Sequence, residues 1–281
     1  MSFSPEWLRL REAADHRSRS LVLARRLKTY FSDHNAVTVY DLGSGLGSNL
    51  RGTYRWLPRR QHWVLVDYDA SLLAAARDEI ERWADKVSPT QGIVDAEKDG
   101  RSLKIEFRCR DLVADPAPWE GERPNLVTAA ALFDLVSAGW ITRFTRAVAT
   151  SGAAFYTVLT HDERAVWVPR HWADADVKAA FESHFGGDKG FGASAGGDAT
   201  RLIAEMLEKD GYKVERGQSP WTLGAQDRAL IASIADGWAA AVRETGRVSE
   251  ADLTEWLASR RGAGTECVIG HEDLLALPPR L

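Results

Sequence analysis

The chain has 281 residues, of which 44% are hydrophobic and 27% are charged, and its formal net charge is −4. This composition is typical of a globular protein, and the acidic balance argues against a broad nucleic-acid-binding surface, which needs a basic field. Because no apolar run is long enough to span a membrane, no signal peptide is visible, and the two cysteines suit neither a disulfide framework nor a metal site, we expect a cytoplasmic protein.

The first half of the chain predicts an N-terminal helix followed by alternating strands and helices. The helix is expected over residues 5–31, because Leu23, Leu27 and Phe31 recur at helical spacing. Strands that alternate with helical patterns predict a parallel sheet with right-handed crossovers, which is an α/β fold. The strands are expected at about 37–42, 62–67, 104–109, 125–130 and 153–159.

The second half predicts a long insertion before the last two strands. Residues 160–199 follow the fifth strand, and long segments at the carboxyl edge of such a sheet usually serve function. Glycines on both sides of Phe191 would let this segment move as a lid, and a plain surface loop is the alternative. The other elements are a helix from Thr200, a strand at 213–218, a helix at 225–244, a helix opened by Ser249 and a final strand at 266–269.

A glycine turn after the first strand carries the strongest functional signal. Asp41 ends the strand, and Gly43, Gly45 and Gly47 follow, so the backbone can adopt positive φ and approach a ligand closely. A dinucleotide-binding turn would have its third glycine at the position of Ser48, so no pyrophosphate clamp is present. The negative charge of Asp41 suits a cationic sulfonium and its amino group better than a phosphate. The turn therefore favours S-adenosylmethionine over NAD.

Two further acids follow later strands. Asp67 closes the second strand, where a carboxylate can accept hydrogen bonds from ribose hydroxyls, and Asp111 follows the third strand. Taken alone, Asp67 also suits the N-cap of the next helix, a position that Asp69 or Ser71 would fill equally well, and Asp111 also suits an ordinary loop. The glycine turn and both acids in this order are more specific than any one of them.

With these motifs, roughly residues 35–220 resemble the class I (Rossmann-like) S-adenosylmethionine-dependent methyltransferases. Residues 41–47 are similar to the family's first motif, 66–73 to its second, 109–112 to the acid after strand 3, and 125–137 to the strand-4 motif. The resemblance implies S-adenosyl-L-methionine as the cofactor and S-adenosyl-L-homocysteine as the product. The cofactor-binding residues that it implies are Asp41, Gly43, Ser44, Gly45, Gly47, Asp67, Tyr68, Asp111, Leu112 and Ala129.

The same resemblance implies a Rossmann-like, mostly parallel seven-stranded sheet with an antiparallel last strand and helices on both faces. We expect a single domain over residues 1–281, with an N-terminal helix and helical lid insertions. Its segments are the helical cap (1–35), the cofactor-binding core (36–159), the lid insertion (160–199) and the C-terminal strands and helices (200–281). The two helices between the last two strands depart from the family pattern, and they either cover the active site or mediate homodimer formation.

The methyl acceptor is expected to be a small molecule that accepts on O, N or C. The fourth strand is not followed by an Asn/Asp-Pro-Pro-aromatic motif or a Pro-Cys motif, which are typical of enzymes that methylate macromolecules. A general base is needed only when the acceptor must lose a proton. Asp134, His161 and Asp162 follow strands 4 and 5 and are the candidate catalytic residues, although Asp134 also suits a helix N-cap and His161 a polar surface.

Several weaker candidates complete the sequence analysis. His171, His184 and Lys189 in the insertion could bind a polar acceptor, and the histidine spacing matches no known metal site. Trp167, Trp172 and Trp221 lie in segments that could line a substrate pocket. Arg11, Arg17 and Arg19 in the first helix are either solvated or, for one of them, able to reach the carboxylate of the cofactor.

Three other functions stay open. A protein or RNA methyltransferase would present an exposed basic groove beside the cofactor, and a closed aromatic pocket would argue against it. A non-catalytic scaffold would bind the cofactor without a cavity near the methyl group. A nicotinamide-dependent dehydrogenase is disfavoured by Asp41 and Ser48.

Overall fold

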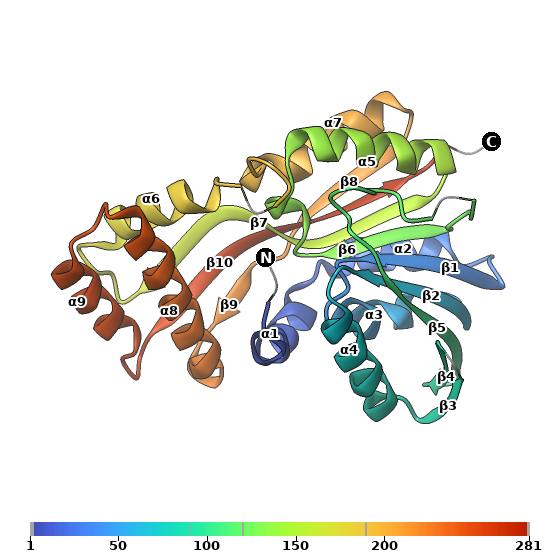
Figure 1. The fold of residues 1–281 in the computed structure, drawn as a ribbon, viewed down its shortest axis with the longest axis horizontal. Coiled ribbons are helices and arrows are strands. Elements are labelled where there is room, and N and C mark those ends of the chain that lie inside the picture. Colours follow the sequence, from blue (N-terminus) through green and yellow to red (C-terminus); the bar gives the residue numbers. More distant parts are fainter. Residues whose placement is uncertain (1–2, 91, 120, 189, 280–281) are drawn as a thin grey trace.

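The structure is a computed structural model that describes residues 3–90, 92–119, 121–188 and 190–279 (Figure 1). Its strands are β1 (Ala36–Leu42), β2 (Arg60–Asp67), β3 (Lys86–Thr90), β4 (Ile93–Lys98), β5 (Arg101–Cys109), β6 (Leu126–Ala130), β7 (Ala154–Val168), β8 (Lys213–Gln218), β9 (Trp221–Leu223) and β10 (Glu266–Leu277). Its α-helices are α1 (Pro5–Ser18), α2 (Leu21–Tyr30), α3 (Ser48–Thr53), α4 (Ala70–Trp83), α5 (Ala138–Ser151), α6 (Asp174–Phe185), α7 (Ala199–Lys209), α8 (Arg228–Thr245) and α9 (Glu250–Arg260).

All of these strands belong to one sheet, whose centre is parallel. The order is β3-β4-β5-β2-β1-β6-β7-β10-β8, and β9 pairs with β10 beside this path. The five strands from β5 to β7 run parallel, and β10 joins β7 in the antiparallel direction. The predicted α/β fold with a mostly parallel centre and an antiparallel last strand is therefore confirmed, although the sheet of the described residues has ten strands rather than seven.

The additional strands lie where the sequence pattern is weak. The antiparallel hairpin of β3 and β4 extends the edge beside β5, and β9 has only three residues. In β4, buried Val94 and Ala96 alternate with exposed Asp95 and Glu97, so only one of its faces is apolar. Short strands of this kind carry little signal in the sequence.

Alternation along β1 places the sheet between two apolar layers. Val37 and Val39 pack into one buried cluster, whereas Tyr40 and Leu42 pack into the other. Successive side chains of a strand point to opposite faces, and a central parallel strand is covered on both. Helices on each side of the sheet supply that cover (Figure 1). No helix in the described part of the chain has the length and apolar character to cross a membrane.

The predicted single helix over residues 5–31 is wrong, because the segment forms α1 and α2. Arg19 separates them with an extended backbone (φ −59°, ψ 144°), and Ser20 caps α2 by accepting a hydrogen bond from the backbone of Leu23. Arg19 is buried and donates hydrogen bonds to Asn49 Oδ1 (3.1 Å) and Thr53 Oγ1 (2.8 Å). This tertiary anchor overrides the helical periodicity of the segment.

Strands β7 and β10 are much longer than the sequence predicted. They pair from Phe155 opposite Ala276 to Val168 opposite Glu266, so residues 160–168 belong to a strand and the last strand continues past Ile269. Beyond the parallel centre, this two-stranded extension carries α6, α8 and α9 (Figure 1, left side). We call the extension with these helices and β9 the arm.

The arm has an apolar interior of its own. The ring of Trp167 lies edge-on to both Trp238 and Trp256, with centroids 5.8 and 5.5 Å away. The buried guanidinium of Arg260 lies beside these rings and donates to Asp174 Oδ1 and to the carbonyl oxygen of Pro169, both at 2.7 Å. The charge is therefore paired inside the arm, which ties α9 to the segment between β7 and α6.

The carboxylate of Asp273 connects the sheet to α2. It is fully buried at a bulge in β10, where Oδ1 accepts from the backbone of Leu159 and Oδ2 from that of Ser20, both at 2.8 Å.

We predict that Asp273→Ala lowers the free energy of unfolding by about 2–4 kcal/mol, because two buried N–H groups lose their acceptor. Urea unfolding measures this change.

The matched control for this prediction is Asp236→Ala. Asp236 is exposed on α8 and pairs with Arg261 on the surface. Loss of such a pair costs about 0.2–1 kcal/mol at most. Equal effects of the two substitutions would contradict the connecting role of Asp273.

Candidate functional site

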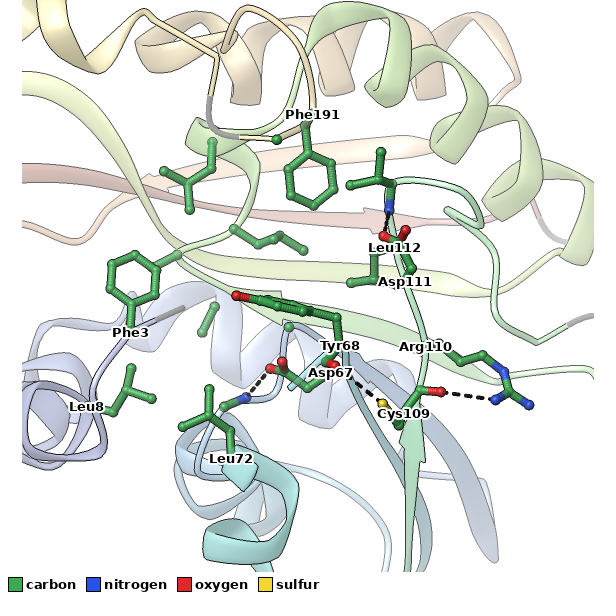
Figure 2. A pocket seen from close by; sticks show the side chains of 18 of the residues that line it. Phe3, Leu8, Asp67, Tyr68, Leu72, Cys109, Arg110, Asp111, Leu112 and Phe191 are labelled. Atoms are coloured by element: carbon green, nitrogen blue, oxygen red, sulfur yellow. Dashed lines mark hydrogen bonds between the residues drawn. The ribbon is translucent and has the colours of Figure 1, made fainter. Parts of the chain in front are cut away.

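A cavity of about 500 Å³ lies where the sequence predicted a nucleoside site, at the carboxyl ends of β1, β2, β5 and β6 (Figure 2). Gly43, Gly45, Asp67, Tyr68 and Asp111 contribute to its wall. The structure thus brings together the turn after β1 and the acids that follow β2 and β5. We call this space the glycine-turn cavity.

The three glycines of the turn have different surroundings. All adopt positive φ: 62° at Gly43, 50° at Gly45 and 74° at Gly47. Gly43 and Gly45 line the cavity, whereas Gly47 opens α3 and lies against Leu65 and Ile80, which a Cβ atom there would meet at 3.4 Å. The first two glycines therefore let a ligand approach the backbone, and the third lets α3 pack closely on the sheet.

Asp67 is held rigidly at the cavity wall. Its Oδ2 accepts from the backbone of Gly45 at 2.9 Å (Figure 2), and its Oδ1 accepts from that of Asp69 at 3.0 Å. Burial raises the pKa of Asp67, and these backbone N–H groups oppose the shift. The N-cap of α4 is Asp69, whose Oδ1 accepts from Ser71 and Leu72. Asp67 is therefore free of that structural task.

The loop after β5 supplies another wall of the glycine-turn cavity. Oδ1 of Asp111 accepts from the backbone of Val113 at 2.8 Å, and the carbonyl oxygen of Leu112 accepts from Trp140 Nε1 at 2.6 Å. Asp111, Leu112 and Val113 line the cavity. Phe191 of the predicted lid also lines it, near Leu112 in Figure 2. The Tyr68 ring is half exposed in the same space.

Besides Gly47, three of the predicted cofactor residues lie beside the cavity rather than in its wall. Ser44 is buried, and its N–H donates to the carbonyl oxygen of Val66 at 3.0 Å. Ala129 is buried in β6, whereas Ala130 and Ala131 line the cavity. Asp41 is fully buried beneath the turn, the third case.

The Asp41 carboxyl group has an unusual environment. Its Oδ1 accepts from Asn49 Nδ2 at 2.7 Å, and its Oδ2 has no hydrogen-bond partner among the described residues. Burial raises the pKa of Asp41 to about 7. The group thus supports the glycine turn from below as a carboxyl that titrates near neutral pH.

A second cavity of about 520 Å³ adjoins the first, and Phe3, Arg11, Ala131 and Leu135 line both. Its wall comes from α1, α6, α8, β9 and β10, so the arm closes over the edge of the parallel core. We call it the aromatic cavity, after the rings in its wall: Trp7, Phe181, Phe185, Trp221 and Trp238.

Besides Arg11 and His184, three titratable side chains line the aromatic cavity: Asp134, His161 and His271. Burial raises the pKa of Asp134, whereas the nearby His161 lowers it, and Asp134 Oδ1 has no partner among the described residues. Burial lowers the pKa of His161 and brings that of His271 well below its usual value. Both imidazoles are therefore neutral at neutral pH.

The two histidines form a cross-strand pair. His161 on β7 lies opposite His271 on β10, and their ring centroids are 5.7 Å apart. Nδ1 of each ring lacks a hydrogen-bond partner in the described part of the chain. The sequence predicted the final strand only over residues 266–269 and gave no sign of this pairing, because the register of β7 with β10 is a tertiary property.

Other predicted residues have different positions. Asp162 is paired with Arg164 and lines neither cavity. His184 lines the aromatic cavity and approaches Glu244 Oε2 at 2.9 Å, whereas His171 lies beside Glu255 on the arm.

Of the three tryptophans, Trp221 lines the aromatic cavity, Trp167 is in the interior of the arm and Trp172 is exposed. Lys189 lies outside the described residues. Those residues contain no group of three side chains arranged to hold a metal ion.

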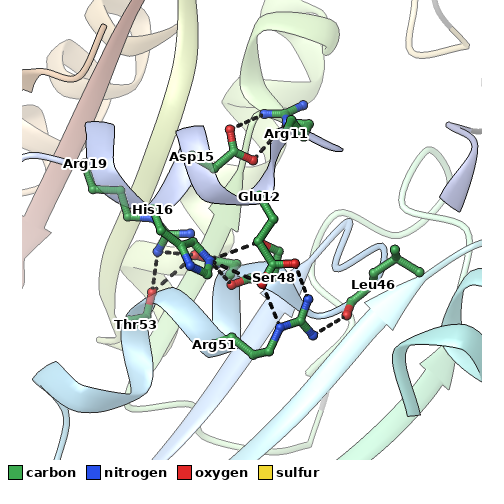
Figure 3. A network of polar contacts seen from close by, with 10 residues as sticks. Arg11, Glu12, Asp15, His16, Arg19, Leu46, Ser48, Arg51 and Thr53 are labelled. Atoms are coloured by element: carbon green, nitrogen blue, oxygen red, sulfur yellow. Dashed lines mark hydrogen bonds and ion pairs between the residues drawn. The ribbon is translucent and has the colours of Figure 1, made fainter. Parts of the chain in front are cut away.

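Helix α1 contributes a cation that faces both cavities. Arg11 donates from Nε and Nη2 to the carboxylate of Asp15 at 2.9 and 3.2 Å (Figure 3). Its guanidinium lies 5.1 Å from the ring centre of Trp221, whose Nε1 also donates to Asp15. Arg17 is paired with Asp227 instead. Only Arg11 of the three N-terminal arginines thus lines a cavity.

Comparison with solved structures identifies the fold. A cyclopropane-fatty-acyl-phospholipid synthase-like protein from Lactobacillus casei is 13% identical to this chain, with a TM-score of 0.51, and the match covers 95% of this chain and 99% of that one. The YcgJ protein from Bacillus subtilis is 12% identical, with a TM-score of 0.49 and coverage of 92% and 100%. A SAM-dependent methyltransferase from Thiobacillus denitrificans is 16% identical, with a TM-score of 0.46 and coverage of 99% and 100%.

No protein-family model matches this chain, and no curated protein matches it. The chain has the Rossmann-like fold of the class I S-adenosylmethionine-dependent methyltransferases, as the resemblance of its motifs implied.

The raised pKa of Asp41 predicts a pH-dependent contribution to stability. Between pH of about 4 and 7, the folded chain holds a proton on Asp41 that the unfolded chain releases, so this contribution falls as pH rises. We predict that the wild type loses roughly 1.4 kcal/mol per pH unit relative to Asp41→Asn across this window. Urea unfolding of both proteins from pH 4.5 to 8 measures the difference. Parallel pH profiles would show that Asp41 does not titrate there.

Proposed function

We propose that this protein transfers a methyl group from S-adenosyl-L-methionine to a small-molecule acceptor. The observation that carries the proposal is the junction of two cavities at the carboxyl end of the sheet. One cavity contains the glycine turn and the acids after β2 and β5, and the other contains aromatic rings and titratable groups. Phe3, Arg11, Ala131 and Leu135 form their common wall. Two reactants bound side by side would meet at this wall.

The residues of the glycine-turn cavity suit the three parts of the proposed cofactor. The oxygens of Asp67 retain lone pairs that can accept from both ribose hydroxyls. Asp111 and the Leu112 segment can hold the adenine, and the half-exposed Tyr68 ring offers a face for the nucleoside. Gly43 and Gly45 remain for the methionyl part.

The aromatic cavity supports a small molecule as the acceptor. Its volume of about 520 Å³ is within the range of small-ligand sites, and its wall is mostly apolar with a few polar groups. Arg11, the cation in its wall, already bonds to Asp15. These features favour a small acceptor over a protein or RNA, which needs a basic groove, and a second cavity beside the first disfavours a non-catalytic scaffold.

The proposed reaction depends mainly on holding the acceptor and the methyl group in the right relative position. When bound, S-adenosylmethionine supplies a methyl group on a positively charged sulfur. The chain's own contribution is to align the acceptor across the common wall and to exclude water with α1 and the Phe191 segment. Asp134 and His161 lie beside the common wall, where they can orient the acceptor or take its proton. Asp162 is a weaker candidate for this role, because Arg164 already holds its carboxylate.

Calorimetric titration tests the cofactor directly. We predict micromolar binding of S-adenosylmethionine and S-adenosylhomocysteine, and no binding of NAD. Asp67→Ala should weaken the affinity for both by about tenfold or more, because a loss of about 1.4 kcal/mol changes the dissociation constant tenfold and two ribose hydrogen bonds are removed.

The control for the ribose assignment is Asp78→Ala, which removes an exposed carboxylate from α4 and should leave the affinity unchanged. Asp67→Asn keeps an amide oxygen near Gly45, so it separates loss of the turn from loss of the ribose contact. Wild-type affinity in both Asp67 variants would refute the assignment.

A further inference from the structure

We infer that the acceptor is an aromatic compound with a hydroxyl group on its ring, a phenol, which binds in the aromatic cavity and transfers its proton to His161. This inference rests on the methyl-transfer function proposed above and specifies the substrate class of the same site.

The shape of the aromatic cavity suits a flat ring. Phe181 and Trp238 are stacked, with centroids 4.2 Å apart and planes 8° from parallel, and Trp221 lies against His271 at 4.9 Å. These rings come from α6, α8, β9 and β10, so several elements present aromatic surface to one space. An aromatic occupant gains offset or edge-to-face contacts here in addition to the burial of its apolar area.

The charges around this cavity favour a neutral polar group on that ring. A carboxylate would need a free cation, but Arg11 already donates two hydrogen bonds to Asp15, and Asp134 would repel it. An ammonium group has no lone pair with which to attack a methyl group until it loses a proton. A hydroxyl group suits neutral imidazoles, because each can donate from one ring nitrogen and accept with the other.

The need for a base separates a phenol from a neutral aromatic amine. An amine nitrogen has a lone pair and can attack before it loses a proton, whereas a phenol has an unperturbed pKa of about 10 and becomes a strong nucleophile only as its proton leaves. His161 is a neutral imidazole beside Asp134, and the electrostatic attraction between the two would stabilise a proton on His161. A buried base of this kind is therefore better suited to an O–H acceptor than to a neutral amine.

The proposed step balances in atoms and charge. The phenol proton passes to an imidazole nitrogen of His161, and an oxygen lone pair forms the new O–C bond to the methyl group. The C–S bond breaks, and its electron pair stays on sulfur. The products are an aryl methyl ether, S-adenosylhomocysteine and the imidazolium of His161, which returns its proton to water after release.

Helix α8 leaves room for the ring. Ser233, Gly237 and Ala241 follow one another at intervals of four residues, and all three line the cavity. A Cβ atom at Gly237 would meet no heavy atom within 4 Å. A larger side chain there would occupy acceptor space without a clash in the empty cavity, so Gly237 is placed to limit acceptor size.

The test uses the full chain with a panel of acceptors that share one ring. Binding of S-adenosylhomocysteine is measured first by calorimetry, and binding of 2-naphthol to that complex is then followed by fluorescence. Transfer of radiolabelled methyl is measured with phenol, 4-methylphenol and 2-naphthol, and with benzylamine, benzoate and cyclohexanol for comparison. We expect transfer to at least one phenol and to none of the other three compounds.

Two variants separate binding from proton transfer. Gly237→Leu should raise KM for the phenol by about tenfold or more, whereas Gly139→Leu on α5, another exposed helical glycine with no atom within 4 Å of its Cβ position, should leave KM unchanged. His161→Gln should lower kcat by about a hundredfold or more, the usual contribution of a general base, and should keep the dissociation constant of 2-naphthol within about threefold.

The outcomes distinguish the inference from the function on which it rests. Absence of S-adenosylhomocysteine binding would overturn the proposed function. Binding of S-adenosylhomocysteine with methyl transfer to no phenol, or to benzylamine or benzoate instead, would overturn the phenol inference alone. An unchanged kcat in His161→Gln would overturn the role of His161.

Discussion

The antiparallel pairing of β7 with β10 is the constraint on which the candidate site depends. β7 begins as the last parallel strand of the core, next to β6, and then continues to Val168 opposite Glu266. That continuation carries the arm, and the arm supplies most of the aromatic cavity. The register also sets His161 opposite His271. A slip of one residue in this register would turn alternate side chains to the opposite face of the sheet. Because the buried carboxylate of Asp273 bonds β10 to Leu159 of β7 at the bulge, it helps to keep His161 and His271 in this register.

Several of the buried polar atoms that lack a partner among the described residues lie at or beside the two cavities. Asp41 Oδ2 lies beneath the glycine turn, and Asp134 Oδ1 and Nδ1 of His161 and His271 belong to residues of the aromatic cavity. An unsatisfied buried polar group costs about 1–3 kcal/mol, and folded proteins keep few of them. These groups remain where a ligand could use them. Other buried atoms without a partner in the described part of the chain lie elsewhere in the fold, among them Arg19 Nε, Trp167 Nε1 and Arg260 Nε, although Asp174 pairs with the charge of Arg260.

The sequence predicts the glycine-turn cavity better than the aromatic cavity, because its signals are local. Periodicity identifies β1 and β2, and the residue types at their ends identify the turn and Asp67. The sequence analysis chose Ala129 as a cofactor-binding residue, but the next two residues, Ala130 and Ala131, line the cavity. Successive side chains of a strand point to opposite faces, so an error of one residue changes which side chain reaches the cavity. The contribution of Phe3, the pairing of His161 with His271 and the extension of β7 follow from contacts between distant segments. The charged residues at 162–164 hide that extension, because one part of β7 is exposed.

Helix α1 joins the two halves of the site. On the side of the core, Glu12 accepts from Arg51 Nε of α3 at 2.8 Å (Figure 3), and on the side of the arm, Asp15 accepts from Trp221 of β9 at 3.0 Å. Arg11 precedes both anchors in the helix, bonds to Asp15 and lines both cavities. The wall of the aromatic cavity can therefore vary through α6, α8 and β9 without any change in the glycine turn or Asp67. Any variation must nevertheless keep the α1 contacts, because they align the two cavities at their common wall.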